Sequence, residues 1–85
     1  MNITLRFFAS VREALGTSTE TLALPDGVAT VGQVRAHLIG RGEPWATALG
    51  QGRALRMARN QVMCDADSVV GEGCELAFFP PVTGG

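Results

Sequence analysis

The sequence predicts an α+β fold, in which a mixed five-stranded sheet has one main helix across one face and short extra helices. Two observations predict it. Segments of alternating hydrophobicity gather toward both ends of the chain, and one strongly periodic helical segment lies between them. The 85 residues, 46 % of them apolar, suffice for a single soluble domain with one core.

The first hairpin is predicted from two alternating segments. In residues 2–8, Ile3, Leu5 and Phe7 share one strand face, and residues 19–24, "TETLAL", alternate in the same way. The connecting stretch "ASVREALG" predicts a short helix that Ser10 caps and Gly16 ends.

The main helix is predicted after the "PDG" turn at residues 25–27. Thr30 and Gln33 have the spacing of a capping box. The apolar stripe that would face the sheet consists of Val31, Val34 and Leu38, and Arg35 is expected mostly off this stripe. A second, shorter helix is expected from Pro44 onward.

The remaining strands follow a glycine-rich loop. Residues 53–64, "RALRMARNQVMC", predict a hairpin that turns at Asn60 and Gln61, and residues 74–79, "CELAFF", predict the last strand. With a hairpin at each end and a crossover between them, the first and last strands become central parallel neighbours. This is the β-grasp, or ubiquitin-like, arrangement, predicted for residues 1–79 and followed by a flexible tail at residues 80–85.

Two phenylalanine pairs predict an apolar outer sheet face. Adjacent strand residues point to opposite faces, so Phe7 and Phe78 enter the core while Phe8 and Phe79 share the uncovered face. Met63 is in phase to join them. Such a cluster either marks a contact surface for a partner or lies beneath the short helices and loops.

The tail "PPVTGG" predicts a reactive chain end. Pro80 and Pro81 end the strand and hold the exit extended, Val82 and Thr83 are slim, and the glycine pair adds no bulk. A frayed end is the commonest alternative, although fraying does not require a stiff Pro-Pro exit. We expect the terminal carboxyl of Gly85 to be the active group.

Composition argues against several function classes. The formal net charge of −1 predicts neither a nucleic-acid nor a membrane partner, and the N-terminal "MNITLRFF" lacks a secretory pattern, so a cytoplasmic location is expected.

Cys64 and Cys74 are expected to be buried reduced thiols. A lone histidine, His37, predicts no metal site, and the chain contains no lysine.

The chain resembles the sulfur-carrier (small) subunit of molybdopterin synthase. The resemblance rests on "AFFPPVTGG", on "FFASVREALG" and on "NQV" in the second hairpin. It implies that a ubiquitin-activating-like adenylyltransferase uses ATP and magnesium to adenylate Gly85, which then becomes a thiocarboxylate. The sulfur would come from a donor such as a cysteine desulfurase or a rhodanese, and this chain would bind no cofactor itself.

The resemblance also implies a partner and its contact residues. The loaded tail would enter the large synthase subunit and donate sulfur to cyclic pyranopterin monophosphate. This tail consists of Pro80, Pro81, Val82, Thr83, Gly84 and Gly85. Catalytic residues would lie on that subunit, typically within a heterotetramer. The implied contact residues for the large subunit are Phe8, Met63, Phe79 and Arg12.

Three alternatives share this pattern. A thiamine-type sulfur carrier would use Gly85 in the same way, although "FFPPVTGG" favours the molybdopterin pathway. A ubiquitin-like modifier would be conjugated through Gly85, without chains built on its own lysines. A pure interaction domain would leave the tail idle.

Overall fold

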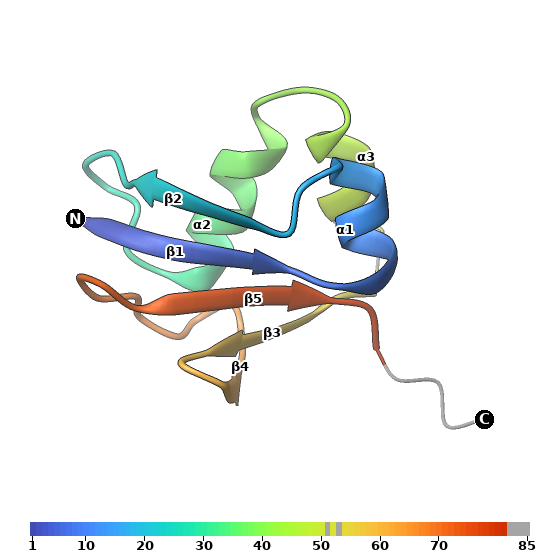
Figure 1. Cartoon of the computed structure of the whole chain (residues 1–85). Helices are drawn as coiled ribbons and strands as arrows, with labels where there is room; N and C mark the ends of the chain where they lie inside the picture. Colours follow the sequence, from blue (N-terminus) through green and yellow to red (C-terminus); the bar gives the residue numbers. More distant parts are fainter. Residues whose placement is uncertain (51, 53, 82–85) are drawn as a thin grey trace.

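The fold is described from a computed structural model, in which residues 1–50, 52 and 54–81 are described. Figure 1 shows a twisted sheet with helices behind it and at one end. In chain order, the elements are β1 (Asn2–Phe7), α1 (Ala9–Leu15), β2 (Thr19–Ala23), α2 (Val31–Ile39), α3 (Trp45–Leu49), β3 (Arg56–Arg59), β4 (Val62–Cys64) and β5 (Glu75–Phe79).

The strands lie in the order β2-β1-β5-β3-β4. β1 and β5 are central and parallel, with Phe7 opposite Phe78, while the pairs β1–β2, β3–β4 and β3–β5 are antiparallel. The predicted β-grasp topology is therefore confirmed. Among the described residues, no helix is long and apolar enough to cross a membrane.

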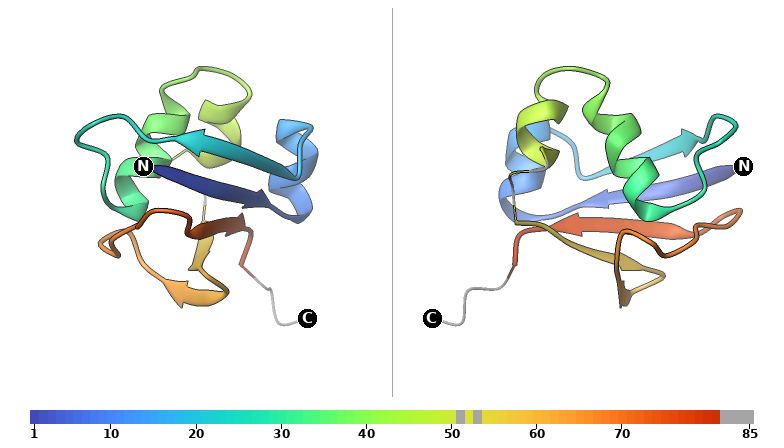
Figure 2. Two further views of the ribbon diagram at one scale, coloured as in Figure 1. Left: turned by 60° about the vertical axis from the view of Figure 1, so that its left-hand side comes forward. Right: turned by 180° about the vertical axis from the view of Figure 1, so that it is seen from behind.

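The two sheet faces differ in what covers them. α2 lies across the sheet face that is turned toward the viewer in the right-hand view of Figure 2. The opposite face, which is toward the viewer in Figure 1, has no helix across it. We call these the inner and outer faces. The most deeply buried inner-face and α2 side chains are Ile3, Leu5, Phe7, Leu76, Phe78, Val31, Val34 and Leu38.

Local sequence explains where α2 begins and where α1 ends. Thr30 and Gln33 form the predicted capping box at the start of α2. Gly16 adopts a left-handed conformation (φ 74°) and ends α1, which favours glycine there. Ser10 does not cap α1, because the helix already begins at Ala9, after an extended Phe8 that occupies the N-cap position and makes no side-chain capping bond. That prediction was wrong.

Arg35 corrects a second prediction, since it is buried rather than off the apolar stripe. Its Nε donates to the carbonyl of Leu49 at 2.7 Å, and its Nη2 donates to that of Gly50 at 2.7 Å. These carbonyls end α3, where no further helical N–H is available to them. Arg35 thus joins α2 to the end of α3, and burial lowers the pKa of its guanidinium.

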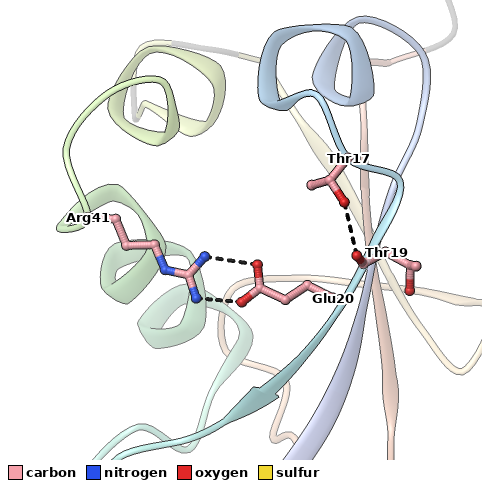
Figure 3. Close-up of polar contacts among 4 residues, drawn as sticks. All are labelled: Thr17, Thr19, Glu20 and Arg41. Carbon is pink, nitrogen blue, oxygen red and sulfur yellow. Dashed lines mark hydrogen bonds and ion pairs between the residues drawn. The ribbon is translucent and has the colours of Figure 1, made fainter.

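An aromatic and charged cluster holds the helices against the sheet. The ring of Phe7 stacks on Phe78 at 6.2 Å between centroids and meets Trp45 edge-on at 5.7 Å. Arg41 lies over Trp45, 4.5 Å from its centroid, and forms two hydrogen bonds with Glu20 of β2 at 3.0 and 2.5 Å (Figure 3). The same view shows Thr17 Oγ1 donating to the Thr19 carbonyl.

Candidate functional site

Phe8 and Phe79 are neighbours across β1 and β5. The backbone N–H of Phe8 donates to the carbonyl of Phe78 at 3.2 Å, which continues the parallel ladder one residue past Phe7–Phe78. Phe8 therefore lies beside Phe79 on the outer face, as predicted. Phe8 is 41 % exposed, and Phe79 is half-buried.

Met63 lies on the same face. It is opposite Ala58 in the β3–β4 pair, and Ala58 is opposite Ala77 in the β3–β5 pair. Met63 is 55 % exposed, and the two alanines are buried. The structure thus places three of the four implied contact residues on one face, and only the small side chain of Ala58 lies between Met63 and β5. Their roles in binding a partner stay predictions.

The fourth implied contact residue, Arg12, lies on exposed α1. Its backbone N–H donates to the carbonyl of Phe8 at 3.3 Å, so Arg12 lies one helical turn beyond Phe8. No ion pair involves its side chain among the described residues. A role for Arg12 at a partner interface also stays a prediction.

Two further residues shape this face and were missed from sequence. Arg6 lies with its guanidinium carbon 5.5 Å from the Phe8 ring centroid and forms an ion pair with Glu75 at 3.5 Å. Arg56 is opposite Phe79 in the β3–β5 register. Alternation predicts their face, but only the register between distant strands shows which residues they flank.

The tail leaves the fold at the end of β5, beside α1. Pro80 and Pro81 are half-buried. Pro80 helps line a small cavity of about 40 Å³ whose other walls are Ser10, Val11 and Ala14 of α1 with Ala48, Ala54 and Leu55. The first tail residue therefore borders the same small cavity as α1. Val82, Thr83, Gly84 and Gly85 lie outside the described residues.

Other chemically active groups lie elsewhere. Cys74 is buried and Cys64 is half-buried, and burial is the main cause that raises the pKa of the Cys64 thiol. In residues 1–50, 52 and 54–81, no three His, Cys, Asp or Glu side chains gather to hold a metal ion. A larger open groove of about 490 Å³ lies near the start of β5, lined in part by Arg59, Val69 and Glu72, at the end away from the tail.

Known proteins resemble this chain over nearly its full length. The ThiS family matches residues 5–85. The molybdopterin synthase sulfur carrier subunit of Haemophilus influenzae is 47 % identical over 79 residues, covering 93 % of this chain and 94 % of the relative. The subunit of the same name from Escherichia coli is 42 % identical over 83 residues, covering 98 % and 99 %.

Solved structures share the fold. SAMP1 from Haloferax volcanii has a TM-score of 0.76 and 29 % identity, with both chains covered completely. A complex of subunits 1 and 2 of the molybdopterin-converting factor from Helicobacter pylori contains a chain with a TM-score of 0.68 and 20 % identity, again with complete coverage of both. The chain therefore belongs to the ThiS family, among the sulfur carrier subunits of molybdopterin synthase.

Proposed function

We propose that this chain donates sulfur within molybdopterin synthase as a thiocarboxylate formed at the carboxyl of Gly85. The observation that carries the proposal is the near full-length match to two curated sulfur carrier subunits. The chain also has the "FFPPVTGG" segment, whose last glycine would bear the sulfur. Its own role is to present the sulfur, while the large subunit supplies the catalytic residues.

The terminal carboxyl must be activated before it can accept sulfur. With an ordinary pKa of about 3.5, it is an anion at neutral pH and resists attack by a nucleophile. Adenylation by a ubiquitin-activating-like enzyme, with ATP and magnesium, would give an acyl-adenylate and release pyrophosphate. The terminal sulfur of a persulfide on a donor such as a cysteine desulfurase or a rhodanese would then attack the carbonyl carbon and displace AMP. A thiol would cleave the S–S bond of the resulting acyl disulfide and release the thiocarboxylate. A terminal glycine leaves the carbonyl carbon unhindered.

The geometry of the fold suits delivery of this group to a partner. Phe8 and Phe79 lie side by side where β5 ends, so a partner that covers them lies next to the start of the tail. From Pro80, an extended chain reaches about 20 Å to Gly85, at ~3.3 Å per residue. The segment contains only proline, valine, threonine and glycine. A narrow channel in the large subunit would admit these residues.

The proposed partner is the large synthase subunit, with cyclic pyranopterin monophosphate as the sulfur acceptor. The complex of subunits 1 and 2 in Helicobacter pylori supports a two-subunit assembly for proteins of this fold. Two loaded carriers would supply the two sulfur atoms of the dithiolene, which fits a heterotetramer. We place this assembly in the cytoplasm, where ATP is available to the activating enzyme.

A second candidate function is protein modification through Gly85. It is favoured by the structural likeness to the Haloferax volcanii protein, which is described as small archaeal modifier protein 1. Because this chain has no lysine, isopeptide chains on its own lysines are excluded. The two functions share activation of Gly85 and differ in the nucleophile that follows.

Intact-mass measurement tests the proposal directly. The chain is incubated with its activating enzyme, ATP, magnesium and a sulfur source, and we expect replacement of one oxygen by sulfur at Gly85. Deletion of Gly85 is the matched control and should abolish the change. The loaded chain should then convert the precursor when mixed with the large subunit. An unchanged mass with an active cognate enzyme contradicts the proposal, and conjugation to target amines favours the modifier.

A further inference from the structure

A row of three side chains crosses the outer face where the tail begins. Phe8 lies beside Phe79 across β1 and β5, and Arg56 of β3 is directly opposite Phe79 on the other side. Directly opposite residues of an antiparallel pair have Cβ atoms about 4.5 to 5.5 Å apart. The Arg56 side chain therefore leaves the backbone directly beside that of half-buried Phe79.

Arg56 is an exposed cation whose charge is not balanced within the described part of the chain. Neither a hydrogen bond nor an ion pair joins its side chain to any described residue. Arg6, on the same face, differs because it pairs with Glu75 at 3.5 Å. Other arginines also have partners: Arg35 binds the carbonyls at the end of α3, Arg41 binds Glu20, and Arg59 donates to the Val69 carbonyl.

A partner that covers Phe79 would also desolvate the guanidinium of Arg56. A partner that buries the outer-face phenylalanines comes within a few ångströms of the Arg56 side chain, and a desolvated cation without acceptors is strongly unfavourable. The planar guanidinium is best matched by a carboxylate, which accepts two parallel hydrogen bonds. A partner that fits this face must therefore offer an acidic group next to its apolar contact.

We propose that Arg56 is a specificity-determining residue, which pairs with an aspartate or glutamate of the large synthase subunit at the edge of the apolar contact. This inference rests on the proposed function, because it takes the large subunit as the occupant of the outer face. Arg56 is opposite the last strand residue before Pro80, so the ion pair fixes the docking register at the point where the tail leaves the sheet. It thereby helps align the tail with its channel.

The dissociation constant of the complex with the cognate large subunit tests the inference. The measurement uses the full chain, by isothermal titration calorimetry over a series of salt concentrations. Arg56→Gln removes one positive charge. Ala36→Glu is the matched control, because it changes the net charge by the same amount at an exposed position on α2, away from the outer face. Arg56→Lys keeps the charge but loses the planar fork.

We expect Arg56→Gln to raise Kd about tenfold and to weaken its salt dependence. Arg56→Lys should give an intermediate Kd, and Ala36→Glu should leave Kd within about twofold of the unaltered chain. Thermal unfolding of each variant verifies that the fold is intact. Because Arg56 is exposed, the substitutions should leave the unfolding temperature nearly unchanged.

The outcomes separate this inference from the function on which it rests. If the unaltered chain binds the large subunit and Arg56→Gln binds equally well, Arg56 remains hydrated at the rim and the inference is wrong, while the proposed function stands. Equal weakening by Arg56→Gln and Ala36→Glu would also overturn it, because only overall charge would then matter. If the unaltered chain neither gains sulfur at Gly85 nor binds the large subunit, both proposals fail.

Discussion

The backbone N–H of Phe8 donates to the carbonyl of Phe78 at 3.2 Å, and this bond extends the parallel pairing of β1 and β5 past the last residue of β1. As a result, Phe8 remains in strand phase beside Phe79 although it directly precedes α1. The bond places an exposed aromatic ring next to the residue that precedes the tail. The proposed partner contact depends on this placement.

Phe8→Ala should weaken binding to the large subunit far more than it destabilises the fold. We expect Kd to rise about thirtyfold, the effect typical of a central aromatic contact, with a loss of unfolding free energy of about 1 kcal/mol. Binding is measured by calorimetry and stability by urea unfolding. Val62→Ala is the control. Val62 is 68 % exposed but directly precedes Met63 in β4, so its side chain points to the other sheet face. Equal Kd values for the two variants would contradict the outer-face contact.

The Glu20–Arg41 pair predicts a loss of stability in acid. The hydrogen bond from Arg41 is the main cause that lowers the pKa of Glu20 from its ordinary value of 4.5. Since the folded-state pKa is below the unfolded one, ionised Glu20 stabilises the fold above about pH 4.5, and this contribution is lost as the pH falls through the folded-state pKa. The partly exposed pair should contribute about 0.3 to 1 kcal/mol.

Urea unfolding near neutral pH and on the acid side of this range measures the contribution. Glu20→Gln should be less stable near neutral pH and lose less stability on acidification than the unaltered chain. Glu13→Gln, at an exposed position of α1, is the matched control. Identical acid responses of the two variants would show that the pair contributes nothing.

Arg35→Met should destabilise the fold by about 2 kcal/mol. The substitution keeps an unbranched side chain in a buried position but leaves the carbonyls of Leu49 and Gly50 without their donor. Arg12→Met makes the same change on exposed α1 and should shift stability by less than about 0.5 kcal/mol. Urea unfolding of both variants compares them. A similar small effect at both positions would mean that water replaces the guanidinium.

Local patterns predicted the elements because the signals that form them are local. Strand alternation separated Phe7 from Phe8, the Thr30–Gln33 spacing identified the start of α2, and the Asn60–Gln61 turn has the positive φ angles of a two-residue hairpin loop. Ser10 was misassigned because the extended conformation of Phe8, held by pairing with β5, moved the N-cap of α1 two residues earlier, from Ser10 to Phe8. Tertiary pairing overrode the local preference there.

The sequence by itself determined the order of elements, the face on which each strand residue lies, and the "FFPPVTGG" segment, since each depends on neighbours within a few positions. Only the tertiary structure decided that Arg56 flanks Phe79 and that Arg35 is buried against the end of α3. These relationships join segments 14 to 23 positions apart through strand register and helix packing. Register and packing arise from the folding of the whole chain, so no local pattern specifies them.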